Sequence, residues 1–167
     1  MHARRLARHV DQTDRTDTIV MRIHFRGIRK LVRRQTADQF QAGGIVIKDT
    51  KDGRKILLVT TRNGKRWIFP KGRVGKKESP EEAAQRETEE ESGVRGRLLA
   101  YVGAAEYRED GDSVRVDYFL LRAEERVQGE EKREVRWCTI DEALDLIESP
   151  ALKKLLSRAW PEIERVE

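Results

Sequence analysis

Cysteine and histidine are scarce in this sequence, and their scarcity limits the chemistry that it can support. A single cysteine, Cys138, can form neither an internal disulfide nor a cysteine-based zinc cluster, so we expect a cytoplasmic protein. The only histidines, His2, His9 and His24, stand near the amino terminus. The rest of the chain therefore has no imidazole for a nucleophile–histidine pair, and carboxylates are left to carry any catalysis.

Long apolar runs are also missing. No stretch approaches the roughly 20 apolar residues that cross a bilayer, and no apolar segment follows the positively charged amino terminus. We therefore expect no membrane segment. Charged residues make up 39% of the 167 residues and hydrophobic residues 37%, but the hydrophobic residues come in clusters. This length and pattern predict one folded domain with extensions.

Positive charge is concentrated at the start of the chain. Residues 1–40 hold nine Arg and one Lys against four Asp, a net charge of +6, so the remainder of a chain of formal charge +5 sums to −1. We interpret residues 1–38 as a basic, flexible extension that is either a solvated tail or a weak contact for nucleic acid. Within it, residues 22–35 fit a helix and an edge strand equally well, and Met21 is a candidate for the true start.

The main domain, residues 39–148, intersperses strands with helices. A β-branched run at 42–49, a turn, and a second apolar run at 55–61 predict a β-hairpin. Further along, residues 96–110 and 112–124 predict a second pair of strands that turn at 110–112, and the second of these runs alternates apolar with polar residues.

The carboxyl-terminal part predicts one more strand and two helices. A short strand is expected at 134–140, followed by helices whose caps are Asp141 and Ser149. The last segment, 149–167, is expected to be a helix that packs on the domain. Because strands and helices alternate and no repeat is present, the predicted fold class is an α/β sandwich around a mixed β-sheet.

An acidic segment, GRVGKKESPEEAAQRETEEESGV, occupies residues 72–94. Its SPEE sequence supplies a capping serine, a proline at the first helical position, and a glutamate that completes a capping box. A glycine at position 93 is a suitable carboxyl-terminal stop. These signals predict a helix over residues 80–92.

Like charges crowd one face of this predicted helix. At 100° per residue, three carboxylates fall within about 100° of arc: Glu87, Glu90 and Glu91. Glu89 points to the opposite side, whereas Glu78 and the carbonyl of Gly72 can approach the acidic face. Oxygen ligands at this density suit Mg²⁺ or Mn²⁺, which would relieve the repulsion. The alternative is a solvated charged face.

The acidic segment resembles the GX5EX7REUXEEXGU signature of the Nudix hydrolases. The fixed positions of that signature are filled by Gly72, Glu78, Arg86, Glu87, Glu90, Glu91 and Gly93, and the last aliphatic position by Val94. Thr88 stands where an aliphatic residue is usual, and we expect it to weaken the core slightly and to touch no ligand. The resemblance implies a Nudix-type α/β/α sandwich around a mixed β-sheet.

The resemblance also implies roles for these residues. Metal ions, Mg²⁺ or Mn²⁺, would be held by Glu87, Glu90 and Glu91, assisted by the Gly72 carbonyl and Glu78. A metal would lower the pKa of a water that attacks a pyrophosphate bridge. The counterpart of Arg86 orients a catalytic glutamate in the family.

Two glutamates are candidates for the general base that takes the proton from the attacking water. Glu90, within the signature, is the first candidate. Glu134 matches a glutamate that several family members carry just before a late strand, where it would serve as base or as an extra metal ligand. Equally, Glu134 fits a surface residue that pairs with a neighbouring arginine.

The segment RNGKRWIFPKGRVGKK brings many basic residues beside the acidic helix, which favours a highly anionic substrate. The candidate phosphate contacts are Lys71 and Arg73 first, then Arg62 and Arg66. The WIFPKG run within this segment resembles the corresponding run of the subfamilies that act on diadenosine polyphosphates and on diphosphoinositol polyphosphates. Trp67 either packs in the core or stacks on a base, and Tyr107 is a weaker candidate for facing the substrate.

The predicted substrates are therefore small anionic diphosphates, and three classes of them are ranked by preference. A dinucleoside polyphosphate comes first, diphosphoinositol or inorganic polyphosphate second, and an RNA 5′ pyrophosphate third. The alternative from another class is a non-catalytic module that senses a nucleotide. The number of subunits does not follow from the sequence.

Overall fold

The computed structural model describes residues 40–109 and 111–167, so the extension predicted at 1–38 and its segment 22–35 lie outside the described residues. The described strands are β1 (Phe40–Thr50), β2 (Gly53–Thr60), β3 (Trp67–Ile68), β4 (Lys71–Arg73), β5 (Val94–Glu109), β6 (Asp112–Arg126) and β7 (Val135–Cys138). The described helices are α1 (Pro80–Ser92), α2 (Ile140–Leu146) and α3 (Pro150–Arg165). None of these three helices has the length and apolar character that a bilayer crossing needs.

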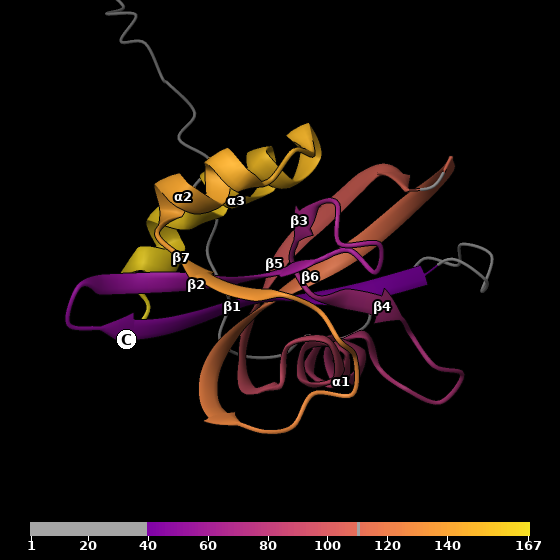
Figure 1. The fold of residues 1–167 in the computed structure, drawn as a ribbon, viewed down its shortest axis with the longest axis horizontal. Coiled ribbons are helices and arrows are strands. Elements are labelled where there is room, and N and C mark those ends of the chain that lie inside the picture. Colours follow the sequence, from indigo (N-terminus) through magenta and orange to yellow (C-terminus); the bar gives the residue numbers. More distant parts are fainter. Residues whose placement is uncertain (1–39, 110) are drawn as a thin grey trace, which may run out of the picture.

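A mixed sheet of seven strands forms the middle layer of the molecule (Figure 1). The main path runs in the order β3-β2-β1-β6-β5, with β4 paired to β1 and β7 paired to β2. The central pair β1 and β6 is parallel, and the other pairs are antiparallel. Helix α1 covers one face, and α2 and α3 cover the other, so the predicted α/β/α sandwich is confirmed.

Both predicted strand pairs are present. In the first hairpin, Ile47 lies opposite Ile56, and the turn closes between Thr50 and Gly53. The second pair, β5 and β6, is longer than predicted, and its register contains three irregularities along β5. The larger hydrophobic core lies between the sheet and the α2–α3 side and includes Leu152 and Leu156 of α3. A smaller cluster lies under α1.

Helix α1 begins and ends at the residues that the sequence predicts. The side chains of Ser79 and Glu82 form the capping box, and Gly93 closes the helix in the left-handed conformation at a φ of 66°. Thr88 is fully buried, and its hydroxyl donates a hydrogen bond of 2.7 Å to the Ala84 carbonyl. A side chain at Gly44 of β1 would overlap that hydroxyl, so small residues on both elements let α1 lie close to the sheet.

The last two helices are present, and only the cap of α2 differs from the prediction. Thr139, and not Asp141, caps α2, and it forms a capping box with Glu142. The backbone of Thr139 is extended, and its hydroxyl therefore accepts a hydrogen bond from the N–H of Glu142 at the start of α2. Ser149 caps α3 as predicted, and this helix runs to Arg165, within the segment 149–167 that was predicted to be helical.

One surface carboxylate joins the sheet to the end of α3. Asp49 accepts hydrogen bonds of 2.6 and 3.0 Å from Arg54 and one of 2.7 Å from Arg122. Arg54 also donates to the Ile163 carbonyl, and Arg122 donates to the Val166 carbonyl at 3.3 Å. The hydrogen bonds from Arg54, more than those from Arg122, lower the pKa of Asp49 to about 2.

We expect Asp49→Asn to lower the free energy of unfolding at pH 7 by roughly 0.5 to 1 kcal/mol, since the carboxylate is half exposed. Because the folded pKa lies below the usual 3.8, this stabilisation is present above pH 4 and disappears as the pH falls toward 2. Urea unfolding of both proteins between pH 7 and pH 2 measures the difference. Asp52→Asn, in the adjoining turn, is the control, and an equal effect there would contradict the assignment.

Candidate active site

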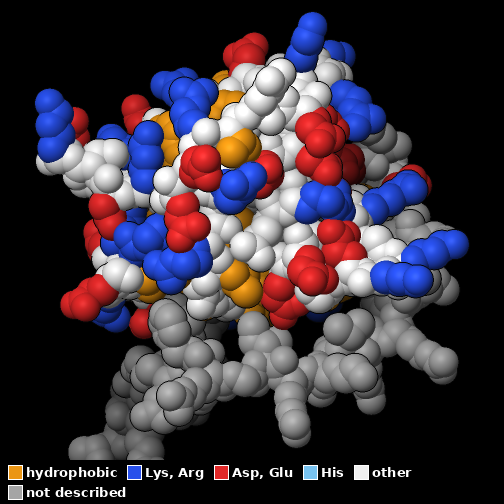
Figure 2. Space-filling view, turned by 90° about the horizontal axis from the view of Figure 1, so that it is seen from below, with side chains coloured by type: hydrophobic (Ala, Val, Ile, Leu, Met, Phe, Trp, Pro, Cys, Tyr) orange, Lys and Arg blue, Asp and Glu red, His pale blue; other side chains and the backbone are white. Residues whose placement is uncertain are grey.

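A cleft of about 860 Å³ opens between β4, the second half of α1 and the connection that leads into β7. Its acidic lining residues are Glu87, Glu90, Glu91, Glu109 and Glu131. Its basic lining residues are Arg62, Arg66, Lys71, Arg73 and Arg133. Figure 2 looks at the molecule from the side of α1 and shows acidic and basic side chains gathered close together on this face. The cleft therefore combines carboxylates with cations that suit an anionic ligand.

Strand β4 passes directly over one carboxylate of the helix. A side chain at Gly72 would occupy the space of the Glu87 carboxylate group. Only glycine therefore lets the β4 backbone lie on Glu87, and this close approach gives the first glycine of the acidic segment a physical reason. The Glu87 side chain is 13% exposed, and its burial raises its pKa.

Arg86 organises the acidic face of α1. Its guanidinium donates two hydrogen bonds to Glu78, of 2.7 and 2.9 Å, and one of 3.0 Å to the carbonyl of Arg73. The Nη1 atom donates to Glu87 at 2.7 Å and to Glu90 at 3.1 Å. These bonds raise the pKa of Arg86, those to Glu78 most. One arginine thus fixes two of the three predicted metal-binding glutamates.

Glu78 does not line the cleft. Besides the two bonds from Arg86, its carboxylate accepts a hydrogen bond of 2.9 Å from the N–H of Gly75. The hydrogen bond from Arg86 is the largest cause of its lowered pKa. Glu78 therefore anchors the loop and Arg86, and its predicted assistance to a metal stays a prediction.

Glu91 is the most buried carboxylate of the cleft, with a side chain that is only 3% exposed. One oxygen pairs with Arg133, and the other accepts a hydrogen bond of 3.1 Å from the backbone N–H of Lys71. Burial raises the pKa of Glu91 to about 7, although Arg133 and the Lys71 N–H act in the opposite direction. Glu89 lies on the opposite side of the helix, as the helical spacing predicts, and it pairs there with Arg95 of β5 at 2.9 Å.

The donor atoms of the acidic face fit a hard divalent cation. Carboxylates and a backbone carbonyl supply only oxygen, and the crowding that helps to raise the pKa of Glu87 is what a cation would relieve. Within residues 40–109 and 111–167, however, no three acidic, histidine or cysteine side chains already surround a common centre. Arg86 pairs with Glu87 and Glu90, and Arg133 pairs with Glu91.

The connection between β6 and β7 brings two residues to the cleft that sequence reasoning missed. The N–H groups of Glu130 and Glu131 donate hydrogen bonds of 2.9 and 3.0 Å to the Glu90 carbonyl, at the end of α1. This attachment satisfies a terminal carbonyl of the helix and places Glu131 and Arg133 against the acidic face. Arg133 also pairs with Glu131 at 2.8 Å.

Glu134 is not brought to the cleft. It is exposed, and its backbone N–H donates to the hydroxyl of Thr60 at the start of the β7 pairing. Glu131, three residues earlier, has its carboxylate in the cleft instead, where it pairs with Arg62 at 3.1 Å. The sequence contains several glutamates before this strand, and nothing in their spacing shows which one the connection turns inward.

The four predicted phosphate contacts all line the cleft, but they differ in availability. Lys71 is buried, and its ammonium group already donates to Glu109 at 2.8 Å and to Gln41 at 3.0 Å. Arg73 is exposed, and the side chain of Arg62 is 83% exposed. The two exposed arginines are therefore better placed for a phosphate than Lys71.

Comparison with known proteins shows which family shares these features. The family model described as NUDIX domain matches residues 39–159, most of the chain. The chain belongs to the Nudix family, as its acidic segment predicts. Enzymes of this family generally use divalent metal ions.

Individual relatives agree with this assignment. Nudix hydrolase 4 of Arabidopsis thaliana is 36% identical over 107 residues, which are 61% of this chain and 52% of that protein. The chain thus spans about half the length of that relative. The diphosphoinositol polyphosphate phosphohydrolase 3-alpha of Mus musculus is 28% identical, over 65% of this chain and 68% of its own. A C. elegans Ap4A hydrolase in a binary complex shares the fold, with a TM-score of 0.64, 24% identity, and coverage of 75% and 96%.

We expect Arg133→Met to lower the free energy of unfolding by about 3 kcal/mol, because Glu91 would stay buried without its cation. Chemical denaturation measures the loss. Adding Glu91→Gln to the same protein should restore most of it. Arg136→Met, at an exposed position of β7, is the control and should change stability by less than about 0.5 kcal/mol. If both single variants were equally stable, the buried pair would have no structural importance.

Proposed function

We propose that the chain is a Mg²⁺-dependent Nudix pyrophosphohydrolase that cleaves a phosphoanhydride bond in a nucleoside diphosphate-linked or polyphosphate substrate. The observation that carries this proposal is the cleft, where the glutamates of α1 lie beside exposed arginines. Carboxylates suit a divalent cation, and the arginines suit the phosphates that this cation would share. Mn²⁺ is the alternative ion.

The proposed metal ligands are Glu87, Glu90 and Glu91 with the Gly72 carbonyl. When bound, a divalent cation neutralises the diphosphate and lowers the pKa of a coordinated water. Arg86 keeps Glu87 and Glu90 in place before the substrate arrives, since its hydrogen bonds fix both carboxylates.

Glu90 remains the first candidate for the general base. Its side chain is 27% exposed, compared with 13% for Glu87 and 3% for Glu91, so it is the most accessible of the three to an attacking water. A base must lie within hydrogen-bond reach of the proton that it removes. Glu131 replaces Glu134 as the second candidate, because its carboxylate lines the same cleft.

The substrate of first choice is a dinucleoside polyphosphate, a small anionic molecule with several linked phosphates. The basic lining of the cleft and its size support a polyphosphate chain. Diphosphoinositol polyphosphate is the second candidate, since a mouse relative carries that activity in its name. Cytoplasmic localisation stays a prediction, because the names of two plant relatives place them in mitochondria and chloroplasts.

Comparing two glutamates of one helix tests the catalytic proposal. We expect Glu90→Gln to reduce the kcat for diadenosine tetraphosphate with Mg²⁺ by about 10² to 10⁴-fold, because an amide cannot accept the proton. Glu89→Gln, on the opposite face, loses the same charge and should retain activity within about threefold. Product release followed by chromatography measures both rates.

Metal removal and a panel of diphosphate substrates complete the test. Activity that disappears on metal removal and returns with Mg²⁺ supports the cofactor. Equal turnover by Glu90→Gln and the unchanged protein would refute the role of Glu90. A protein that binds the nucleotide but hydrolyses none of a panel of diphosphates would instead be a nucleotide sensor.

A further inference from the structure

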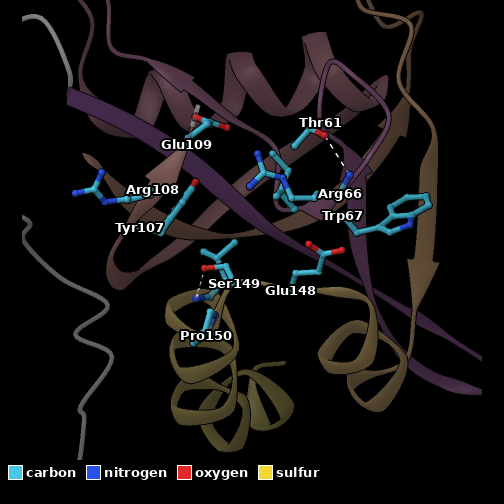
Figure 3. A pocket seen from close by; sticks show the side chains of 11 residues that line it. Thr61, Arg66, Trp67, Tyr107, Arg108, Glu109, Glu148, Ser149 and Pro150 are labelled. Atoms are coloured by element: carbon cyan, nitrogen blue, oxygen red, sulfur yellow. Dashed lines mark hydrogen bonds between the residues drawn. The ribbon is translucent and has the colours of Figure 1, made fainter. Parts of the chain in front are cut away.

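Glu109, the last residue of β5, lies where the cleft meets a second, smaller pocket of about 270 Å³. Tyr107 and Glu148 line the smaller pocket, as does Trp67, which also packs against the larger core. Figure 3 shows Glu109 and Pro150 at opposite sides of this pocket. The Glu109 carboxylate therefore stands at the border of the proposed metal site and outside the acidic face of α1.

The Glu109 carboxylate neutralises a buried ammonium group. The side chain of Lys71 is only 7% exposed, and its Nζ atom donates hydrogen bonds of 2.8 Å to Glu109 and 3.0 Å to Gln41. An ammonium group that has lost its hydration needs a counter-ion, because an uncompensated buried charge is strongly destabilising. Glu109 supplies that counter-ion from a strand that is distant from Lys71 in the sequence.

Lys71 belongs to the short strand that forms one wall of the proposed metal site. Strand β4 has three residues, and among the described strands it pairs with β1 alone. The backbone N–H of Lys71 donates to Glu91 at 3.1 Å, and the next residue is Gly72, whose carbonyl is a proposed ligand. At the other end of β4, Arg86 holds the Arg73 carbonyl at 3.0 Å. A shift of the Lys71 end would therefore displace two proposed ligands together.

Close packing ties the ammonium group of Lys71 to the backbone of β4. Lys71 lies opposite Gly43 of β1. A Cβ atom at Gly43 would come within 2.8 Å of the Lys71 Cβ and within 2.7 Å of the Tyr118 ring. The stem of the lysine thus fills a space that only glycine leaves open, and its ammonium end reaches Gln41 and Glu109. A stem packed in this way transmits the position of its charged end to the backbone.

We propose that Glu109 is a positioning residue, which acts through Lys71 to hold the β4 backbone where Glu91 and the Gly72 carbonyl bind one divalent cation together. The inference deepens the proposed function and rests on it for the metal. Lys71 then serves the site by placing its backbone, and not as the phosphate contact that the sequence predicts. Outer partners of this kind orient ligands that they do not touch, and their loss weakens metal binding.

Binding of Mn²⁺ to the full chain tests this role, since the paramagnetic resonance signal of the free ion measures the affinity without any turnover. We expect Glu109→Met and Lys71→Met each to raise the Kd for Mn²⁺ about tenfold, because both variants release β4. Charge alone predicts a different pattern, in which losing the cation strengthens Mn²⁺ binding and losing the anion weakens it. Opposite shifts of the Kd in the two variants would therefore overturn the proposal.

Two matched variants control for the loss of charge. Glu109→Gln keeps an oxygen that accepts a hydrogen bond from Lys71, so its Kd for Mn²⁺ should stay within about threefold of the unchanged protein. Glu106→Met removes an exposed glutamate of β5 that pairs with Arg115 at 3.0 Å, and its Kd should also stay within about threefold. A Kd that rises as much in Glu109→Gln as in Glu109→Met would refute the positioning role.

Hydrogen exchange separates this inference from the hydrolase proposal. The amides of residues 69–74 should exchange about tenfold faster in Glu109→Met than in the unchanged protein, because β4 opens more often, whereas Glu106→Met should leave them unchanged. The amides of β6 are the internal reference for the global fold. Faster exchange in a protein that binds no metal would support the positioning of β4 and refute the metal proposal. Unchanged exchange in Glu109→Met would overturn the positioning role and leave the hydrolase proposal untouched.

Discussion

The contact of one guanidinium with three carboxylates is the interaction on which the cleft depends. Arg86 binds Glu78 outside the cleft and Glu87 and Glu90 inside it, and it also reaches the backbone of β4. A positive charge in this position lets Glu87 and Glu90 share one helix face, because it offsets their mutual repulsion. The loop, the strand and α1 are thereby held in one arrangement before any ligand binds.

A second guanidinium, that of Arg133, offsets the negative charge of the remaining cleft glutamates. Arg133 pairs with the buried Glu91 and with Glu131, and its segment is attached to the end of α1 through the Glu90 carbonyl. The acidic face is thus enclosed between two arginines, one on the helix itself and one from a distant connection. Each arginine stands where a cation is needed, and we infer that a divalent metal would share this compensation when it binds.

Much of the fold was predictable because its signals are local. The capping box at Ser79 and the glycine at position 93 define α1 through contacts within four residues, and the β1–β2 hairpin follows from a turn between two apolar runs. The cap of α2 was predicted two residues too late, because two suitable residues stood close together and the local backbone conformation selected Thr139. The basic extension lies outside the described residues, so its prediction is untested.

The sequence by itself determined the acidic helix, the spacing of its glutamates and the family to which the chain belongs, because all of these depend on neighbours along one short segment. Only the tertiary structure decided which distant groups meet that helix. It turned Glu131 and not Glu134 toward the cleft, paired Lys71 with Glu109, and placed Tyr107 and Glu148 around one pocket. These choices depend on how separate strands and connections pack, and residue spacing along the chain carries no information about such contacts.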